Sequence, residues 1–426
     1  MVDFQPLSGY NSSMYQRNLI TNLQAALSDT PVVLINGARQ TGKSTLTKSL
    51  PEHAANYYSL DNATVLNLAL ADPDGFIQSM PDHVILDEIQ HIKDLFRAIK
   101  LAVDEKRTPG RFLLTGSANV LLLPQLSESL AGRIEILTLW PLSQGEIHGV
   151  KETIIDQLFN YHPFTVTKTS FDRQSIIDII TTGGYPEIVD RKTPDRRRAW
   201  FDSYITTILQ RDVRDIANIE GLTELPRLLT LLAARAATLL NFAELGRTTG
   251  IAQTTLKRYM TLLEITFLIQ YLPAWASNHS KRLVKSPKVL LNDTGLLSHL
   301  LGIDAQRFMV EPHLLGKILE NFVAMELYKQ ATWSKTKPQL FHYRTQAGQK
   351  VDVLLENAAG EIVGIEVKAS NSVATQDFKG LQDLAETTGK KFIAGAVLYL
   401  GQNVLPFGKN MYALPVSSLW ELHSII

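Results

Sequence analysis

The eight residues Gly37-Ala38-Arg39-Gln40-Thr41-Gly42-Lys43-Ser44 fit the pattern G-x-x-x-x-G-K-[ST]. They follow an apolar run at residues 31–35, which suits a buried strand, and they precede a helical pattern at residues 45–50. Glycines in such a turn allow backbone N–H groups to surround phosphate oxygens, and the helix N-terminus adds a favourable dipole. We therefore expect residues 37–45, with Thr45 the last, to bind ATP. In this site Lys43 would contact the β- and γ-phosphates, and the Ser44 hydroxyl would hold Mg²⁺.

A second motif, His83-Val84-Ile85-Leu86-Asp87-Glu88, is an apolar run that ends in two acids. In a parallel sheet the end of such a strand lies at the same edge as the P-loop. We expect Asp87 to hold Mg²⁺ and Glu88 to orient and deprotonate the attacking water. The order Asp then Glu favours hydrolysis of ATP over binding alone.

Polar residues also follow the next apolar run, in Phe112-Leu113-Leu114-Thr115-Gly116-Ser117-Ala118-Asn119. We expect this strand to neighbour the P-loop strand and Ser117 to sense the γ-phosphate, with Thr115 and Asn119 as alternatives. Arg133 is a candidate arginine finger, directed toward a neighbouring subunit. The alternative is a surface or structural arginine. An arginine finger of this kind would require a homo-oligomer.

Strand patterns alternate with helical patterns through the first third of the chain. The five strand candidates are residues 31–35, 57–60, 84–86, 112–114 and 134–139. Such alternation is typical of an α/β fold with a parallel sheet and helices on both faces. The alternation stops near Trp140-Pro141, and a mainly helical region follows.

The composition limits the partners and the location. The 42 Lys and Arg residues equal the 42 Asp and Glu residues, so any nucleic-acid surface must be local. The absence of cysteine excludes disulfides, cysteine-based zinc sites and thiol nucleophiles. We find no signal-peptide pattern and no apolar run of roughly 20 residues that would span a bilayer. The expectation is a cytoplasmic protein without a membrane partner.

These motifs together resemble a known family, the AAA-type ATPases that carry a DUF4143 C-terminal half, within the AAA+ superfamily. The resemblance covers nearly the whole chain. It rests on the P-loop and on Tyr58-Ser59-Leu60-Asp61, Ile85-Leu86-Asp87-Glu88, Leu114-Thr115-Gly116-Ser117, Leu130-Ala131-Gly132-Arg133, Gly183-Gly184-Tyr185-Pro186-Glu187, Gln210-Arg211-Asp212, Lys285-Ser286-Pro287-Lys288 and Asp293-Thr294-Gly295-Leu296. It implies an AAA+-type sheet, ATP and Mg²⁺.

Residues 240–269 have helix-turn-helix spacing, with Asn241 as N-cap and Gly250 at the end of the first helix. A basic run without acids follows, and strands near residues 269–272 and 290 would form a wing. The residues that we expect to contact DNA are Thr254, Thr255, Lys257, Arg258, Lys281, Arg282, Lys285 and Lys288. Winged helices also serve as protein-interaction modules and as structural lids, and this alternative stays open.

Four charged residues near the C-terminus, Glu320, Asp352, Glu366 and Lys368, have the spacing of a PD-(D/E)xK nuclease core. Glu366 and Lys368 are two residues apart on a strand, so they point to the same face. Asp352, Glu366 and Lys368 would be catalytic, and Glu320, Asp352 and Glu366 would hold Mg²⁺. The alternatives are a hairpin with solvated charges and a nuclease fold kept for DNA binding or docking. Val351 replaces the usual proline before the first acid.

We therefore predict four domains. They are a AAA+-type P-loop ATPase domain (1–145), a helical connector (146–220), a winged-helix domain (221–304) and a PD-(D/E)xK nuclease-like α/β domain (305–426). The favoured function is ATP binding and hydrolysis coupled to action on DNA, with metal-dependent cleavage as an added activity. The alternative is a nucleotide-controlled switch or scaffold for a protein partner, with an inert nuclease-like domain.

Overall fold

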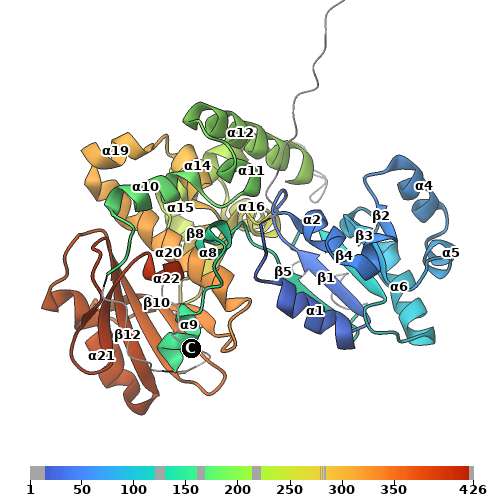
Figure 1. The fold of residues 1–426 in the computed structure, drawn as a ribbon. Coiled ribbons are helices and arrows are strands. Elements are labelled where there is room, and N and C mark those ends of the chain that lie inside the picture. The colour runs from blue at the N-terminus through green and yellow to red at the C-terminus, as the bar shows by residue number, and fades with distance from the viewer. Residues whose placement is uncertain are drawn as a thin grey trace, which may run out of the picture.

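The computed structural model describes residues 15–119, 130–160, 168–213, 222–278, 280, 282 and 285–421. The N-terminal module contains a five-stranded sheet in the order β2-β3-β4-β1-β5 (Figure 1). Its strands are β1 (Val32–Asn36), β2 (Tyr57–Ser59), β3 (Val84–Asp87), β4 (Phe112–Gly116) and β5 (Ile134–Thr138). All neighbouring pairs are parallel. The predicted parallel sheet is confirmed, and so is the prediction that the strand at 112–114 neighbours the P-loop strand.

Both faces of this sheet are buried, because alternate residues of each strand point to opposite sides. Val32 and Leu34 of β1 belong to a core on the side of α6, whereas Val33 and Ile35 belong to a core on the side of α1. The helices of the module are α1 (Ile20–Asp29), α2 (Lys43–Lys48), α3 (Pro51–Ala54), α4 (Ala63–Ala71), α5 (Pro73–Gln78), η1 (Ile89–His91) and α6 (Asp94–Glu105).

A helical region follows the sheet. It consists of α8 (Gln144–His148), α9 (Ile154–Phe159), α10 (Arg173–Thr182), α11 (Pro186–Val189), α12 (Pro194–Thr207), η3 (Ile208–Asp212), η4 (Leu222–Glu224) and α14 (Leu225–Ala234). Two later helices, α18 (Thr294–Leu300) and α19 (Ala305–Val310), pack against α10. Helices from both sides of the predicted boundary at 220 therefore lie together. The predicted boundaries near 145, 220 and 305 remain predictions.

A helix pair and a small antiparallel sheet occupy residues 238–291. The helices are α15 (Phe242–Thr249) and α16 (Gln253–Ile265), and the sheet order is β6 (Thr238–Leu239), β8 (Lys288–Leu291), β7 (Ile269–Leu272). The Asn241 side chain accepts a hydrogen bond from the Glu244 N–H at 3.1 Å, and Gly250 ends α15 in the left-handed conformation. Both helix-end predictions are confirmed.

The C-terminal region is a six-stranded mixed sheet in the order β13-β14-β12-β11-β10-β9. Its elements are η5 (Pro312–Leu314), α20 (Leu315–Ala331), β9 (Gln339–Arg344), β10 (Lys350–Glu356), β11 (Ile362–Lys368), η6 (Thr375–Phe378), α21 (Lys379–Thr388), η7 (Gly389–Lys391), β12 (Phe392–Tyr399), β13 (Leu405–Pro406), β14 (Met411–Pro415) and α22 (Ser418–Glu421). The predicted order of helix, three strands, helix and strand is found. One sheet face shares a core with α20 and the helical region, and α21 packs on the other face.

None of the helices in the described part of the chain combines the length and the apolar character needed to cross a membrane.

Two glycines that are each the second residue of a helix test how closely the helical region is packed. A Cβ atom on Gly295 in α18 would lie 2.3 Å from the carbonyl oxygen of Thr182 in α10, whereas a Cβ atom on Gly316 in α20 would meet nothing within 4 Å. We expect Gly295→Ala to lower the free energy of unfolding by about 1–3 kcal/mol, because α18 must move away from α10. Gly316→Ala should be neutral or stabilising by up to about 1 kcal/mol.

Thermal unfolding of the two variants measures this difference. Equal unfolding midpoints for Gly295→Ala and Gly316→Ala would contradict the close packing of α18 on α10.

Candidate nucleotide-binding site

The P-loop connects β1 to α2. Gly42 is the residue before α2 and has a left-handed backbone, with φ of 92°. Gly37 has φ of 151°, and a Cβ atom there would lie 2.2 Å from the carbonyl oxygen of Leu139, just after β5. Glycine is required at both positions, at Gly42 by the backbone conformation and at Gly37 chiefly by the close approach of another segment.

Lys43 is the first residue of α2 and lies inside the loop. Its side chain is 4% exposed, and its ammonium group donates hydrogen bonds to the carbonyl oxygens of Gly37 at 3.0 Å and Ala38 at 2.9 Å. The Thr41 hydroxyl also donates to the Ala38 carbonyl, at 3.0 Å. The loop is thus closed around a buried positive charge.

The carboxylate of Asp87 accepts hydrogen bonds from three side-chain hydroxyl groups of the site. The Ser44 hydroxyl donates to the two carboxylate oxygens of Asp87 at 3.1 and 3.2 Å, and the hydroxyl groups of Tyr57 and Thr115 donate to the same carboxylate. Burial, and then the neighbouring Asp87 carboxylate, raise the pKa of Tyr57 above its ordinary value, so this phenol stays a donor. The Ser44 and Asp87 oxygens are of the type and spacing that suit Mg²⁺.

Glu88, the proposed base, follows Asp87 with a left-handed backbone, φ 59° and ψ 45°. Its N–H donates to the Thr115 hydroxyl at 3.2 Å. The Gln90 side-chain amide donates both to the Glu88 carboxylate and, at 2.9 Å, to the Ser117 hydroxyl. The predicted base and the predicted sensor are therefore brought together through one glutamine. The third sensor candidate, Asn119, donates its backbone N–H to the Ile265 carbonyl at the end of α16, at 2.7 Å, and its side-chain oxygen is buried without a hydrogen-bond partner among the described residues.

Arg133 lies at the opposite edge of the sheet from the P-loop. Its carbonyl accepts a hydrogen bond from the N–H of Val32, the first residue of β1, while the P-loop follows the last residue of β1. A five-residue strand separates the two by about 15 Å. The Arg133 guanidinium forms an ion pair with Asp104 at 2.6 Å. The ion pair is what the alternative of a surface or structural arginine expects, and the arginine finger toward a neighbouring subunit stays a prediction.

Three residues that sequence reasoning missed support the site, namely Arg17, Tyr57 and Gln90. The Arg17 guanidinium donates to the carbonyl oxygens of Thr41 at 2.6 Å and Trp140 at 2.7 Å, and it pairs with Glu146 at 3.1 Å. Gln90 follows the Asp-Glu pair closely, and this proximity was a usable signal. No local pattern marks Arg17 or Tyr57.

The residues expected to contact DNA divide into two groups. Thr254, Lys257 and Arg258 are exposed on α16, Thr255 is half-buried there, and Lys285 is exposed. Lys281 lies outside the described residues.

Arg282 and Lys288 correct the expectation of one exposed basic run. The Arg282 side chain is 10% exposed and pairs with Glu356 through two contacts of 2.5 and 3.0 Å. The Lys288 side chain is 9% exposed and pairs with Glu320 at 2.5 Å. Each cation is neutralised by a carboxylate, buried for Glu320 and half-buried for Glu356, so neither is a free charge for phosphate contacts.

The C-terminal acids Glu320, Asp352 and Glu366 lie close together, and each of them contacts at least one lysine side chain. Glu320 accepts from Lys288 at 2.5 Å and from Lys317 at 2.7 Å. Asp352 accepts from Lys350 at 3.0 Å, and its second oxygen accepts from the Val367 N–H at 3.1 Å.

Glu366 completes this buried charge cluster. It pairs with Lys368 at 3.4 Å and with Lys350 at 3.5 Å. The expected neighbours are therefore brought together. Among the described residues, however, no group of three or more histidine or acidic side chains has the arrangement of a metal site. The lysine ammonium groups neutralise the charge that Mg²⁺ was expected to neutralise.

The two strand acids differ in protonation. Burial acts to raise the pKa of Asp352, but Lys288 and Lys350 outweigh it, and the pKa lies below its ordinary value. Burial, and then the negative charge of Asp352, raise the pKa of Glu366 to about 7. Asp352 thus loses its proton more readily than an ordinary aspartic acid, whereas Glu366 keeps its proton to a higher pH than an ordinary glutamic acid.

The sheet order and the P-loop define this chain as a P-loop protein of the α/β class. Protein-family models match residues 29–148 to an AAA domain, residues 173–307 to a domain of unknown function, DUF8612, and residues 315–419 to a domain of unknown function, DUF4143. An uncharacterized protein of Mycobacterium tuberculosis is 32% identical over 416 residues, which are 96% of this chain and 86% of that protein. A Mycobacterium bovis protein gives the same values. The chain belongs to this family of AAA-domain proteins with a DUF4143 region.

Solved structures with a partial likeness include a Walker-type ATPase of Pyrococcus abyssi, at 15% identity and a TM-score of 0.36, covering 70% of this chain and 99% of that one. The RuvB Holliday junction branch migration motor of Thermotoga maritima has 19% identity and a TM-score of 0.29, covering 59% and 88%. AMPPCP-bound DnaA from Aquifex aeolicus has 14% identity and a TM-score of 0.30, covering 61% and 89%.

The raised pKa of Glu366 gives a pH-dependent prediction. Folded Glu366 holds a proton at pH values where the unfolded chain, with an ordinary pKa of 4.5, has lost it. The free energy of unfolding therefore falls as the pH rises from about 4.5 to about 7. Glutamine cannot ionise, so Glu366→Gln should gain about 1–3 kcal/mol relative to the wild type between pH 5 and pH 8.

Urea unfolding at the two pH values measures this gain. Glu386→Gln, on the exposed face of α21, is the control. It should change the free energy of unfolding by the same amount at both pH values. If Glu366→Gln differed from the wild type by the same free energy of unfolding at both pH values, the pKa of Glu366 would be ordinary.

Proposed function

We propose that this protein binds ATP together with Mg²⁺ and hydrolyses it. The observation that carries the proposal is the contact between the Ser44 hydroxyl and the Asp87 carboxylate. This contact joins the phosphate loop to the end of β3. Glu88, the proposed general base, is the next residue. A structural loop has no need of a buried lysine, a hydroxyl and two acids at one sheet edge.

Each residue has a distinct role in this proposal. The N–H groups of residues 37–45 and the Lys43 ammonium hold the phosphates, while Ser44 and Asp87 hold Mg²⁺, which neutralises charge on the β- and γ-phosphates when bound. Glu88 accepts a proton from a water molecule whose oxygen bonds to the γ-phosphorus as the bond to the β,γ-bridging oxygen breaks, and ADP leaves. Ser117, joined to Glu88 through Gln90, senses the γ-phosphate.

Two variants separate binding from hydrolysis. Glu88→Gln should bind ATP with nearly normal affinity but lose turnover by about 100-fold or more, because the water loses its base. Lys43→Ala should lose both binding and turnover, because the charge on the phosphates is removed. Phosphate release and binding of a fluorescent ATP analogue measure the two properties.

Glu105→Gln, an equally small change at the exposed end of α6, is the matched control and should behave as the wild type. Wild-type turnover in Glu88→Gln would remove Glu88 from the mechanism.

We further propose that the hydrolysis acts on DNA through α16. Helices α15 and α16 with the sheet β6-β8-β7 have the order of a winged helix-turn-helix, and α16 presents Thr254, Lys257 and Arg258 to solvent. The hydrogen bond from the Asn119 N–H to the Ile265 carbonyl joins the end of α16 to the sensor segment. This contact supports communication between nucleotide state and the DNA-binding surface.

Salt dependence tests this surface. Removal of two phosphate contacts in the double variant Lys257→Ala, Arg258→Ala should reduce the slope of log affinity against log salt concentration by roughly 1.8 on duplex DNA. The control is Lys390→Ala, Lys391→Ala, which removes two exposed charges in η7. An unchanged slope in the α16 variant, or an equal change in both, would exclude α16 as the DNA-binding surface.

The buried charge cluster favours a second candidate function, a nucleotide-controlled switch or scaffold in which the nuclease-like domain is inert. Lys288, Lys350 and Lys368 pair with the acids that a nuclease would use to hold Mg²⁺. Strand scission of DNA that disappears in Asp352→Asn would favour cleavage, whereas nucleotide-dependent assembly without scission would favour the switch.

A further inference from the structure

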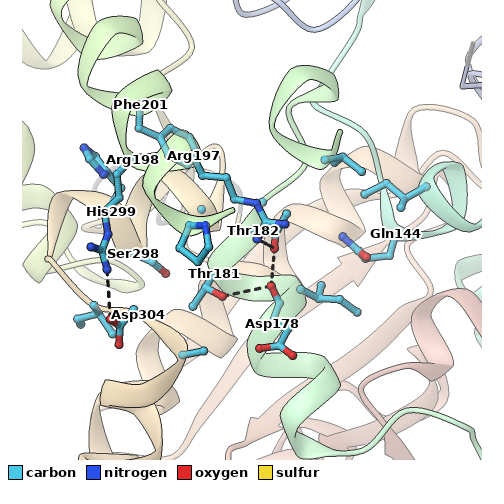
Figure 2. Close-up of a pocket in the computed structure, with 18 of the residues that line it drawn as sticks. Gln144, Asp178, Thr181, Thr182, Arg197, Arg198, Phe201, Ser298, His299 and Asp304 are labelled. Carbon is cyan, nitrogen blue, oxygen red and sulfur yellow. Dashed lines mark hydrogen bonds and ion pairs between the residues drawn. The ribbon is translucent and has the colours of Figure 1, made fainter. Parts of the chain in front are cut away.

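A cavity of about 830 Å³ lies among the helices beyond the P-loop, bounded by α10, α12, α18 and α19 (Figure 2). Its volume suits a small organic ligand, since such sites span roughly 300–1,000 Å³. No residue expected to bind ATP or DNA lines it. The cavity is therefore a separate candidate site.

Arg197 of α12 is a charged group on the cavity wall, and the carboxylate of Asp178, on the same wall, is near enough to act on its charge. Its guanidinium donates to the Arg191 carbonyl and to the Thr182 hydroxyl, both at 2.8 Å, and both acceptors are neutral. Within the described parts of the chain it forms no ion pair with a carboxylate. A half-buried guanidinium with neutral acceptors attracts an anion.

The other charged groups of the cavity limit the ligand. Arg198 is neutralised by Asp304 at 3.2 Å, and His299 contacts Asp202 at 3.0 Å. The carboxylate of Asp178 also lines the cavity, and it would repel a second negative charge. The ligand should therefore carry one anionic headgroup.

The rest of the wall is largely apolar, with one unsatisfied hydroxyl. The Ser298 side chain is 2% exposed, and its oxygen has no hydrogen-bond partner among the described residues. Figure 2 shows Ser298 beside His299 on the wall of the cavity. The apolar lining residues are Ile147, Ile179, Val189, Pro194, Phe201, Ile303 and Ala305. An apolar body attached to the headgroup would cover them.

We propose that this cavity binds a small organic anion with an apolar body, with Arg197 contacting its headgroup, and that occupancy alters nucleotide binding through α12. The effect on nucleotide binding rests on the proposed ATP binding and hydrolysis. Binding of the anion in the cavity does not.

Helix α12 connects the cavity to the P-loop by direct contacts. Phe201, which lines the cavity, packs on Trp200 with ring centroids 5.3 Å apart, and Trp200 stacks on Tyr204 at 4.8 Å. The Tyr204 hydroxyl donates to the Arg39 carbonyl in the P-loop at 3.4 Å. Arg197, Phe201 and Tyr204 follow one another at helical spacing, so they form one stripe along α12. A ligand that shifts Phe201 therefore acts one helical turn from the nucleotide site.

The binding test uses anilinonaphthalene sulfonate, a fluorescent probe with an aromatic body and one fixed negative charge, on the full chain without nucleotide. Three consecutive arginines, Arg196, Arg197 and Arg198, provide matched variants. Arg197→Gln should weaken probe binding by about tenfold. Arg196→Gln removes the same charge at an exposed position that does not line the cavity, and it should change the affinity by less than about twofold.

Two further variants keep the test decisive if Arg197→Gln unfolds. Arg197→Lys retains the charge and should retain most of the affinity, whereas Ala305→Phe fills the cavity from α19 and should abolish binding. Equal affinity for the probe in Arg197→Gln, Arg196→Gln and Ala305→Phe would overturn the proposal. So would loss of the probe in Lys43→Ala instead, because the probe would then occupy the P-loop.

Coupling is measured as the change in the KM for ATP when the cavity is filled. In the wild type the probe should change this KM by about threefold or more, and the ATP analogue should in turn change the affinity for the probe. Tyr204→Phe should bind the probe normally but lose the change in KM. Probe binding without any change in KM would leave a ligand site but overturn its regulatory role. Absence of ATP turnover with intact probe binding would refute the proposed hydrolysis and not the site.

Discussion

The buried carboxylate of Asp87 is the interaction on which the nucleotide site depends. Three hydroxyl groups from separate segments donate to it, Ser44 from the start of α2, Tyr57 from β2 and Thr115 from β4. A buried carboxylate without such donors would be costly. The three donors therefore hold α2, β2 and β4 at the end of β3. The same contacts bring the oxygens of Asp87 and Ser44 together, which is the basis of the proposed Mg²⁺ site.

The nucleotide site is not an isolated unit, because backbone atoms around it are held by the remainder of the chain. Arg17 binds the carbonyl of Thr41, Tyr204 binds that of Arg39, and the N–H of Asn119 binds the carbonyl of Ile265. These contacts come from the N-terminal segment, the helical region and the end of α16. A change in loop conformation on nucleotide binding must alter some of them. These contacts are the ones through which the proposed coupling of nucleotide state to α12 or α16 would act.

The C-terminal charge cluster shows how the same acids take different roles in different surroundings. Glu320, Asp352 and Glu366 lie close together, and repulsion among buried acids must be offset by cations or by protons. Lysines supply the cations, and the raised pKa of Glu366 supplies a proton near neutrality. The charges of the cluster are thus balanced from within the chain, although one carboxylate oxygen of Glu366 is buried without a hydrogen-bond partner among the described residues.

The P-loop and the strand acids were predictable from the sequence because their causes are local. Gly42 adopts a left-handed backbone conformation that favours glycine. Lys43 and Ser44 follow it directly at the start of α2. Asp87 is the last residue of an apolar strand. The fold of the first module followed from alternating patterns for the same reason, and so did the helix ends at Asn241 and Gly250. Parallel strand order also made the neighbourhood of β1 and β4 predictable.

Only the tertiary structure decided which charges meet. Lys288 is 32 residues from Glu320 and 64 residues from Asp352, yet it pairs with both. In sequence it belonged to a basic run without acids, so its charge was expected to face phosphates. Arg282, Arg17 and Tyr57 likewise take partners from distant segments. The pairing of a charge depends on burial and on distance in space, and neither quantity is encoded in the residues that flank it.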